Sequence, residues 1–308
     1  MIDKLLKLRE NLTKVILGKP AAADLVITAL CANANILMED VPGIGKTTMA
    51  KALAASIQAD FKRVQFTPDL LPSDILGSSI FNPQTGEFTF RQGPVFTNIL
   101  LADEINRASP RTQSALLEAM SERQVSLDGR TYPLPHPFLV IATENPIEYQ
   151  GTYPLPEAQL DRFAMQIALG YPDEEHEIEI VHTHRDNHPL QTIGPVLTLT
   201  DIQSLQQQVR EVQIERSMAE YLARVVRATR EEPSILLGAS PRALITLMRC
   251  AQARAYLDGR NFIIPEDVKS LAVVTLAHRI VLENKSRYSG VDRKTVIRDV
   301  IDKVKVPA

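Results

Sequence analysis

The stretch Asp40-Val-Pro-Gly-Ile-Gly-Lys-Thr-Thr48 decides the fold of this 308-residue chain. It lies between a short apolar run, residues 35–39, and a segment with alanine and leucine at helical spacing, residues 47–56. A glycine-containing turn between a strand and a helix directs backbone N–H groups inward, where they bind phosphate. The stretch therefore predicts a nucleotide-binding loop.

Two side chains of this loop have specific predicted roles. In the pattern G-x-x-x-x-G-K-[ST], the lysine reaches the β- and γ-phosphates and the hydroxyl residue ligates Mg²⁺. Lys46 and Thr47 occupy these two positions. Asp40 occupies the first glycine position, and we expect the turn to form because aspartate tolerates unusual backbone angles better than most residues. The predicted nucleotide-binding residues of the loop are Asp40, Val41, Pro42, Gly43, Ile44, Gly45, Lys46, Thr47 and Thr48.

The first half of the chain alternates strand-like and helical patterns. Apolar or alternating runs predict strands at 35–39, 61–67, 98–102 and 138–143, and helices are predicted between them, for example at 110–123. Such alternation predicts a parallel sheet with helices on both faces. Two short β-hairpins interrupt this pattern, at 80–90 and at 124–132, the second with Asp128-Gly129 at its turn.

The chain changes character near Tyr171-Pro-Asp173, beyond which strand patterns largely disappear. Helices are predicted at 173–184, 200–212, 217–231, 240–258 and 265–282. Ser240-Pro241 places a capping residue and a proline where a helix begins. We therefore expect an α/β nucleotide-binding core over residues 1–170, followed by a smaller all-α domain over residues 171–308.

Composition argues against several classes of protein. A formal net charge of −3 and the absence of tryptophan argue against a nucleic-acid binder. No apolar run approaches the length of a membrane span, and the N-terminal residues have no secretory signal pattern. Cys31 and Cys250 are far apart in helical surroundings, which favours buried free thiols over a disulfide. We expect a cytoplasmic protein with no direct membrane insertion.

Five further residues meet the needs of phosphoanhydride hydrolysis, which requires a held metal, an activated water and positive charge at the transition state. Asp103 ends the apolar run 98–102 and is a candidate Mg²⁺ ligand, acting through water. Glu104 follows it and is placed to polarise the attacking water. Asn145 is a candidate partner of the γ-phosphate or of that water. Arg162 and Arg242 are the candidate transition-state cations.

Each of these residues also has a plain structural interpretation. Asp103-Glu104 could be a polar strand end, and Asn145-Pro146 could be a simple turn. Arg162 could pair with Asp161, and Arg242 could be an exposed residue of a first helical turn, although it opposes the helix dipole there. A metal site at His182, His184 and His188 is disfavoured, because no cysteine lies nearby and the context is solvated. Order and spacing favour the catalytic interpretation.

That order resembles the MoxR family of AAA+ ATPases. The matching strings cover nearly the whole chain: Glu39-Asp-Val-Pro-Gly-Ile-Gly-Lys-Thr-Thr48, Pro68-Asp-Leu-Leu-Pro-Ser-Asp74, Gly93-Pro-Val-Phe-Thr-Asn98, Leu101-Ala-Asp-Glu-Ile-Asn-Arg-Ala108, Ala142-Thr-Glu-Asn-Pro146, Leu155-Pro-Glu-Ala-Gln-Leu-Asp-Arg-Phe163 and Gly238-Ala-Ser-Pro-Arg-Ala243. The resemblance implies an AAA+ core with two inserted hairpins, a helical lid, and an ATPase site formed between subunits of a ring, usually a hexamer.

The resemblance also implies roles for individual residues. Lys46 and Thr47 match Walker A, Asp103 and Glu104 match Walker B, and Asn145 matches sensor 1. Arg162 matches the arginine finger, which serves the neighbouring subunit's ATP, and Arg242 matches sensor 2. Whether Arg242 serves its own or the neighbour's nucleotide stays open. The segment that cups adenine corresponds to Val15, Ile16, Leu17 and Gly18.

The predicted activity is Mg²⁺-dependent ATP hydrolysis that drives chaperone-like remodelling, and the resemblance suggests partners with von Willebrand factor A domains. A nucleic-acid motor would share the hairpins, but these carry Glu87 with Arg91 and Asp128 with Arg130, which nearly cancel. A chelatase-type motor that inserts metal into a porphyrin would share the whole site. A non-hydrolysing scaffold is disfavoured, because the predicted catalytic residues are intact.

Overall fold

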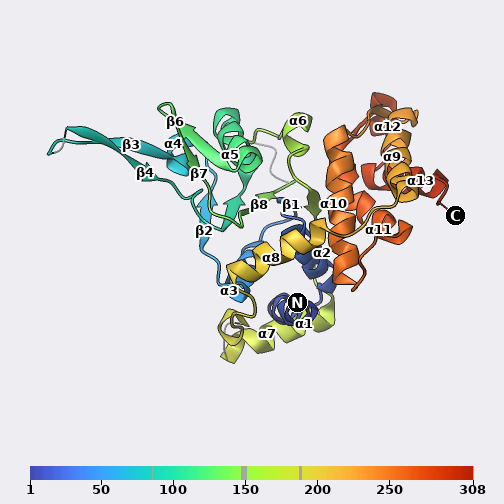
Figure 1. Ribbon diagram of the computed structural model, residues 1–308, viewed down its shortest axis with the longest axis horizontal. Helices are drawn as coiled ribbons and strands as arrows, with labels where there is room; N and C mark the ends of the chain where they lie inside the picture. The colour runs from blue at the N-terminus through green and yellow to red at the C-terminus, as the bar shows by residue number, and fades with distance from the viewer. Residues whose placement is uncertain (85, 147–150, 187–188, 308) are drawn as a thin grey trace.

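A five-stranded parallel sheet forms the centre of the protein (Figure 1). The computed structural model describes residues 1–84, 86–146, 151–186 and 189–307. In spatial order, the strands of the sheet are β2 (Phe61–Gln65), β5 (Ile99–Asp103), β8 (Leu139–Glu144), β1 (Ile36–Glu39) and β9 (Met165–Ile167).

Helices cover both faces of this sheet, as predicted. Side chains alternate along each strand, so Ile36 and Met38 of β1 join one hydrophobic cluster and Leu37 joins the other. The first cluster contains apolar residues of α1 (Ile2–Val15), α2 (Pro20–Cys31), α3 (Lys46–Ser56) and the second half of the chain. The second lies under α4 (Pro72–Leu76) and α5 (Pro110–Glu122).

The predicted strands differ from the observed ones mainly at their ends. The predicted strand 98–102 runs instead over Ile99–Asp103, so Asp103 is part of the sheet, opposite Gln65 of β2. The predicted strand 61–67 ends two residues early, at Gln65. These shifts matter for function because they place polar residues directly at the carboxyl edge of the sheet.

Two β-hairpins extend away from the sheet, as predicted. The longer one, β3 (Gly77–Asn82) and β4 (Glu87–Gln92), projects furthest from the body of the molecule (Figure 1). The shorter one is β6 (Gln124–Leu127) and β7 (Arg130–Pro133). Asp128 and Gly129 both have positive φ, which is the geometry of the tight turn that the Asp-Gly pair predicts. A hydrogen bond of 2.6 Å from Ser79 Oγ to Asp128 Oδ2 joins the two hairpins.

The rest of the chain is mainly helical. Short helical turns lie at Ile105–Arg107 (η1), Glu157–Leu160 (α6) and Pro189–Thr192 (η2). The longer helices are α7 (Glu174–Asp186), α8 (Leu199–Arg210), α9 (Arg216–Glu231), α10 (Pro241–Leu257), α11 (Pro265–Leu276) and α13 (Arg293–Lys303), with the short α12 at Asn284–Tyr288.

One predicted helix, over residues 265–282, is wrong at its C-terminal end. It ends at Leu276 and is followed by a 3₁₀ turn, η3 (Ala277–Arg279), and by a two-residue strand, β11 (Val281–Leu282). β11 pairs with β10 (Ile235–Leu237) in a small antiparallel ribbon. The 3₁₀ turn directs two polar side chains, His278 and Arg279, onto the carbonyl oxygen of Phe163.

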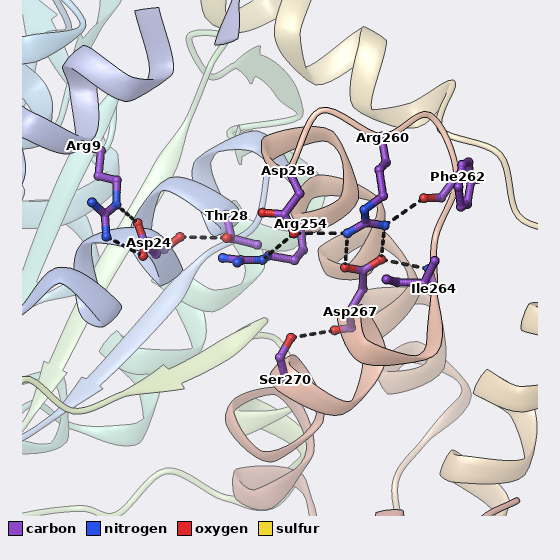
Figure 2. A network of polar contacts seen from close by, with 10 residues as sticks. All are labelled: Arg9, Asp24, Thr28, Arg254, Asp258, Arg260, Phe262, Ile264, Asp267 and Ser270. Atoms are coloured by element: carbon purple, nitrogen blue, oxygen red, sulfur yellow. Dashed lines mark hydrogen bonds and ion pairs between the residues drawn. The ribbon is translucent and has the colours of Figure 1, made fainter. Parts of the chain in front are cut away.

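Ion pairs lie within the N-terminal helices and within the lid helices where the two groups approach each other (Figure 2). Arg9 of α1 pairs with Asp24 of α2, and Arg254 of α10 pairs with Asp258. These four residues border one cavity of about 250 Å³. Arg260 then forms a two-pronged pair with Asp267, which also accepts the backbone N–H of Ile264 at 2.9 Å. The hydrophobic cluster that both groups of helices share packs the lid against the core.

The two cysteines are free and buried, as predicted. Burial raises the pKa of each thiol to about 12, so both are uncharged at neutral pH and chemically inert. No helix in the described part of the chain combines the length and apolar character needed to cross a bilayer.

Candidate active site

The phosphate-binding loop joins the carboxyl end of β1 to the first residue of α3. Gly43 and Gly45 have φ of +86° and +99°, which glycine adopts without strain, and Gly45 caps the helix. The first N–H groups of α3 are therefore free to bind an anion. Lys46 is buried, and its Nζ donates to the carbonyl oxygen of Asp40 at 2.6 Å. Burial lowers the pKa of Lys46, an effect opposed by the negative charges of Asp40, Asp103 and Glu104.

The turn forms with Asp40 in the first glycine position, as expected, but tolerance of unusual backbone angles is not needed there. The φ angle of Asp40 is not positive, so this position does not require unusual backbone angles. Instead, its Oδ2 accepts the backbone N–H groups of Leu169 and, at 3.0 Å, Gly170. Its own N–H donates to the carbonyl oxygen of Glu144 at 3.2 Å. Asp40 thus ties the loop to the strands on either side of β1.

The acidic pair at the end of β5 is held by neighbouring strands. Asp103 accepts the guanidinium of Arg63 at 2.6 and 2.9 Å through Oδ2, and the Thr143 hydroxyl at 2.6 Å through Oδ1. The same Thr143 oxygen accepts the backbone N–H of Glu104 at 2.8 Å. Asp103 is therefore fixed from both sides, by β2 and by β8.

Glu104 has a backbone conformation that non-glycine residues rarely adopt, with φ of 57° and ψ of 52°. Such strain is concentrated at functional sites. Its Oε2 accepts the Gln65 amide at 2.7 Å and the Arg107 guanidinium at 2.9 Å. The carboxylate of the candidate base is therefore held at the carboxyl edge of the sheet, next to Asp103.

Strand β8 brings the remaining predicted residue of this edge into place. Glu144 pairs with Glu39 of β1, so Asn145 follows at the level of Asp40. Asn145 is buried. Burial, together with the nearby charge of Glu39, raises the pKa of Glu144 to about 7. A carboxyl group with a raised pKa therefore lies beside the phosphate loop.

The predicted adenine segment also lies against the loop. It follows α1, and Ile16 Cδ1 lies so close to Gly45 that a Cβ there would be 3.2 Å from it. At Gly18, whose φ is +70°, a Cβ would lie 2.8 Å from the His176 ring. His176 is held by Asp173 through its backbone N–H, at 3.0 Å, and through Nδ1. Residues 15–18 and His176 thus form one wall beside the loop.

The residues of this edge fit a hard divalent cation. Thr47 and Asp103 offer a hydroxyl and a carboxylate oxygen, the donors that Mg²⁺ takes in addition to water and phosphate. No group of three or more His, Cys, Asp or Glu side chains is assembled as a metal site among the residues that the structure describes. Of the His182, His184 and His188 set, the His184 side chain and all of His188 lie outside the described atoms.

The two predicted arginines lie together, but away from the phosphate loop. Arg162 and Arg242 line one pocket of about 270 Å³ with Asn35, Arg123 and Arg249, and none of the loop residues 40–48 lines it. Asn35 directly precedes β1 and Asp40 directly follows it. Because β1 has four residues, the pocket and the loop lie at opposite edges of the sheet, about 13 Å apart along the strand.

The contacts of Arg162 exclude the interpretation that it is a plain ion-pair partner of Asp161. Its Nη1 donates to the carbonyl oxygen of Leu117 at 2.6 Å and to the Ser121 hydroxyl at 3.0 Å, both on α5. Asp161 contacts other residues, Ser240 and Arg279. Arg242 is exposed at the second position of α10.

Several residues of the site escaped the sequence prediction. Arg63 and Gln65 alternate along one strand and so share a face, but only the pairing of β2 with β5 shows that they contact the acidic pair. Arg249 could have been found, because seven residues after Arg242 is the same face of a helix. Thr143, Arg107 and His176 gave no local signal.

Comparison with known proteins agrees with this geometry. Residues 35–165 match the ATPase family associated with various cellular activities (AAA), and residues 227–300 match the AAA lid domain. The chain is 40% identical to Chaperone MoxR1 of Mycobacterium tuberculosis over 303 residues, which cover 96% of this chain and 80% of the relative. It belongs to the MoxR family of AAA+ ATPases.

Other relatives extend this MoxR assignment. YeaC of Bacillus subtilis, an uncharacterised protein, is 50% identical over 97% of this chain and 93% of its own. Protein MoxR of Methylorubrum extorquens is 30% identical over 91% of this chain and 88% of its own. A crystal structure of a candidate ATPase from Cytophaga hutchinsonii superposes with a TM-score of 0.91 at 39% identity, over 100% of this chain and 96% of that one. The AAA+ core and helical lid predicted from the sequence are thereby confirmed, and membership of this family implies nucleotide binding.

Proposed function

We propose that this MoxR protein is a Mg²⁺-dependent ATPase whose site is completed by a second copy of the chain, in a ring that resemblance to the family suggests is a hexamer. One observation carries the proposal. Lys46, Asp103 and Glu104 lie at the carboxyl edge of the sheet, whereas Arg162 and Arg242 lie at the amino edge. This separation supports a role for both arginines at the nucleotide of a neighbouring subunit, with Arg242 acting in trans.

Residues of the carboxyl edge bind and orient the reactants. The loop N–H groups and Lys46 bind the phosphates, and Val15 to Gly18 cover the adenine. Thr47 and Asp103 would hold Mg²⁺, which when bound would neutralise negative charge on the phosphates. Glu104 accepts a proton from the attacking water, and Asn145 orients that water or the γ-phosphate.

The arginines supply positive charge where the transition state becomes more negative. An arginine finger contributes about 10³–10⁵-fold in kcat in other phosphoryl-transfer enzymes. In a ring, Arg162 and Arg242 of one subunit would approach the γ-phosphate held by the next. Assembly and ATP hydrolysis are then coupled, because neither edge of one chain is sufficient.

The purified protein tests the chemistry directly. It should release phosphate from ATP only with a divalent cation present. Glu104→Gln should bind ATP with unchanged affinity and lower kcat by about 10²–10⁴-fold, since it retains the hydrogen-bonding shape but cannot take the proton. Glu220→Gln, an exposed acid on α9, is the matched control. Wild-type turnover by Glu104→Gln would contradict the assignment of the base.

We further propose that hydrolysis drives chaperone-like remodelling of a partner protein in the cytoplasm, with von Willebrand factor A domain proteins as the leading class. The name of the relative Chaperone MoxR1 and the family resemblance support this proposal. A nucleic-acid partner is not expected, because the hairpins are nearly neutral and Asp128 is engaged by Ser79. Pull-down with Glu104→Gln should retain such a partner with ATP and release it with ADP. Retention that does not depend on the nucleotide would contradict the proposal.

A further inference from the structure

Asp161 bridges the segments that carry the two arginines. It directly precedes Arg162, and its carboxylate accepts the Ser240 hydroxyl at 3.0 and 3.1 Å. Ser240 lies two residues before Arg242 and caps α10, accepting the backbone N–H of Ala243 at 3.1 Å. One carboxylate of the core therefore contacts the start of the lid helix that presents Arg242.

A buried arginine of the lid, Arg279, contacts the same segment, residues 161–163. Arg279 Nη2 donates to the carbonyl oxygens of Asp161, at 3.2 Å, and Phe163, at 2.8 Å, which flank Arg162. Its Nε lies 3.4 Å from Asp161 Oδ1. The Arg279 side chain is only 1% exposed, and burial lowers its pKa to about 10, so it is charged at neutral pH.

The buried charge of Arg279 requires the contacts that Asp161 and Phe163 provide. A buried guanidinium is costly unless a carboxylate and good acceptors meet it, and Asp161 supplies both a carboxylate and a carbonyl oxygen. His278 adds a second contact to the Phe163 carbonyl oxygen at 2.9 Å. The backbone around Arg162 is thus held by the lid, while the Arg162 side chain is oriented by Leu117 and Ser121 of α5.

We propose that Asp161 is a positioning residue that, with Ser240 and Arg279, fixes Arg162 and Arg242 as one unit directed at the neighbouring subunit's nucleotide. The inference rests on the proposed function. It has a mechanical consequence: a shift of the lid that moves Ser240 or Arg279 also moves Arg162. The lid position of one subunit then sets the rate of hydrolysis in the next.

Substitutions at Ser240 separate this role from helix capping. Aspartate caps a helix as well as serine does, but Ser240→Asp places a second carboxylate beside Asp161. Ser240→Thr keeps the hydroxyl and is the matched control. Each is combined with Glu104→Gln to make a donor subunit, which has no base of its own but presents intact arginines. The acceptor subunit is Arg162→Ala, which retains its own base.

Mixing donor and acceptor subunits measures the arginines alone. The Ser240→Thr donor should support phosphate release within about twofold of the donor with unmodified Ser240. The Ser240→Asp donor should lower kcat of the mixture by about 10²-fold, because small misplacements of catalytic groups have effects of that size. The KM for ATP should stay constant, since ATP is bound by the acceptor. A loss of folding would instead change ATP binding or lower Tm in the donor itself.

Equal activation by the two Ser240 donors overturns the proposal. If Ser240→Asp does not fold, Asp161→Asn is used in its place. This substitution removes the charge that faces Arg279 and keeps an acceptor for the Ser240 hydroxyl. An Asp161→Asn donor as active as the unmodified donor also overturns the proposal. The donor with unmodified Ser240 tests the proposed function separately, through phosphate release in its mixture with Arg162→Ala. If that donor already fails to activate Arg162→Ala, the shared site itself is wrong.

Discussion

The carboxyl and amino edges of the sheet both concentrate charge, but they treat it differently. At the carboxyl edge the charges are satisfied within one chain: Lys46 is buried, and Asp103 and Glu104 each accept hydrogen bonds from basic residues. At the amino edge Arg242 and Arg249 are exposed, and neither has an ion-pair partner among the residues that the structure describes. This contrast supports our proposal that the carboxyl edge binds a nucleotide and that the amino edge acts on a neighbouring subunit.

The largest expected effect comes from the amino edge. Arg162→Ala should lower kcat by about 10³–10⁵-fold while the chain still binds ATP, because the residue contributes only at the transition state. The measurement pairs steady-state phosphate release with equilibrium binding of a fluorescent ATP analogue. Arg216→Ala, an exposed arginine on α9, should retain full activity. If ATP binding fell together with kcat, the amino edge would be part of the chain's own nucleotide site and the contrast between the edges would break down.

A smaller effect should follow when the carboxyl edge loses Arg63, whose guanidinium contacts Asp103. Arg63→Gln removes the guanidinium that orients Asp103. Loss of such an outer partner weakens metal sites by about 10–100-fold. We therefore expect the Mg²⁺ concentration for half-maximal activity to rise by about tenfold, with Arg63→Lys intermediate. A Mg²⁺ requirement that is unchanged or lower would show that Arg63 does not support the metal ligand.

Most of the carboxyl edge could be predicted from the sequence, whereas the contacts that assemble the amino edge could not. The loop, the acidic pair and Asn145 each stand at the end of an apolar run, so local patterns locate them. Asp161, Ser240 and Arg279 are brought together by tertiary packing across 118 positions of the chain. The C-terminal end of α11 is wrongly predicted for the same reason. His278 and Arg279 contact the carbonyl oxygen of Phe163, which is distant in the sequence, and this contact replaces the helical continuation that the local pattern predicts.

The smallest effect is a pH dependence confined to the carboxyl edge. The pKa of Glu144, about 7 in the folded protein, lies above its ordinary value of 4.5. The folded protein therefore holds this proton more tightly, and the free energy of unfolding falls as pH rises from about 4.5 to 7. Glu144→Gln should be more stable than the wild type at pH 8, by at most about 3 kcal/mol. The difference should vanish below pH 4.5.

Thermal or urea unfolding across this pH range measures the effect. Glu10→Gln, an exposed acid on α1, is the control for a change of net charge. A constant stability difference between Glu144→Gln and the wild type from pH 5 to 8 would contradict the buried, protonated carboxyl group beside the loop.

Mixed rings test most directly whether the two edges belong to one shared site. Arg162→Ala and Glu104→Gln subunits, each nearly inactive alone, are combined at varied ratios and assayed for phosphate release. Random assembly joins an intact base to an intact arginine at about a quarter of the sites in an equal mixture, so activity should peak there at about a quarter of the wild-type rate per subunit. Activity that equals the sum of the two parents at every ratio would show that each chain completes its own site.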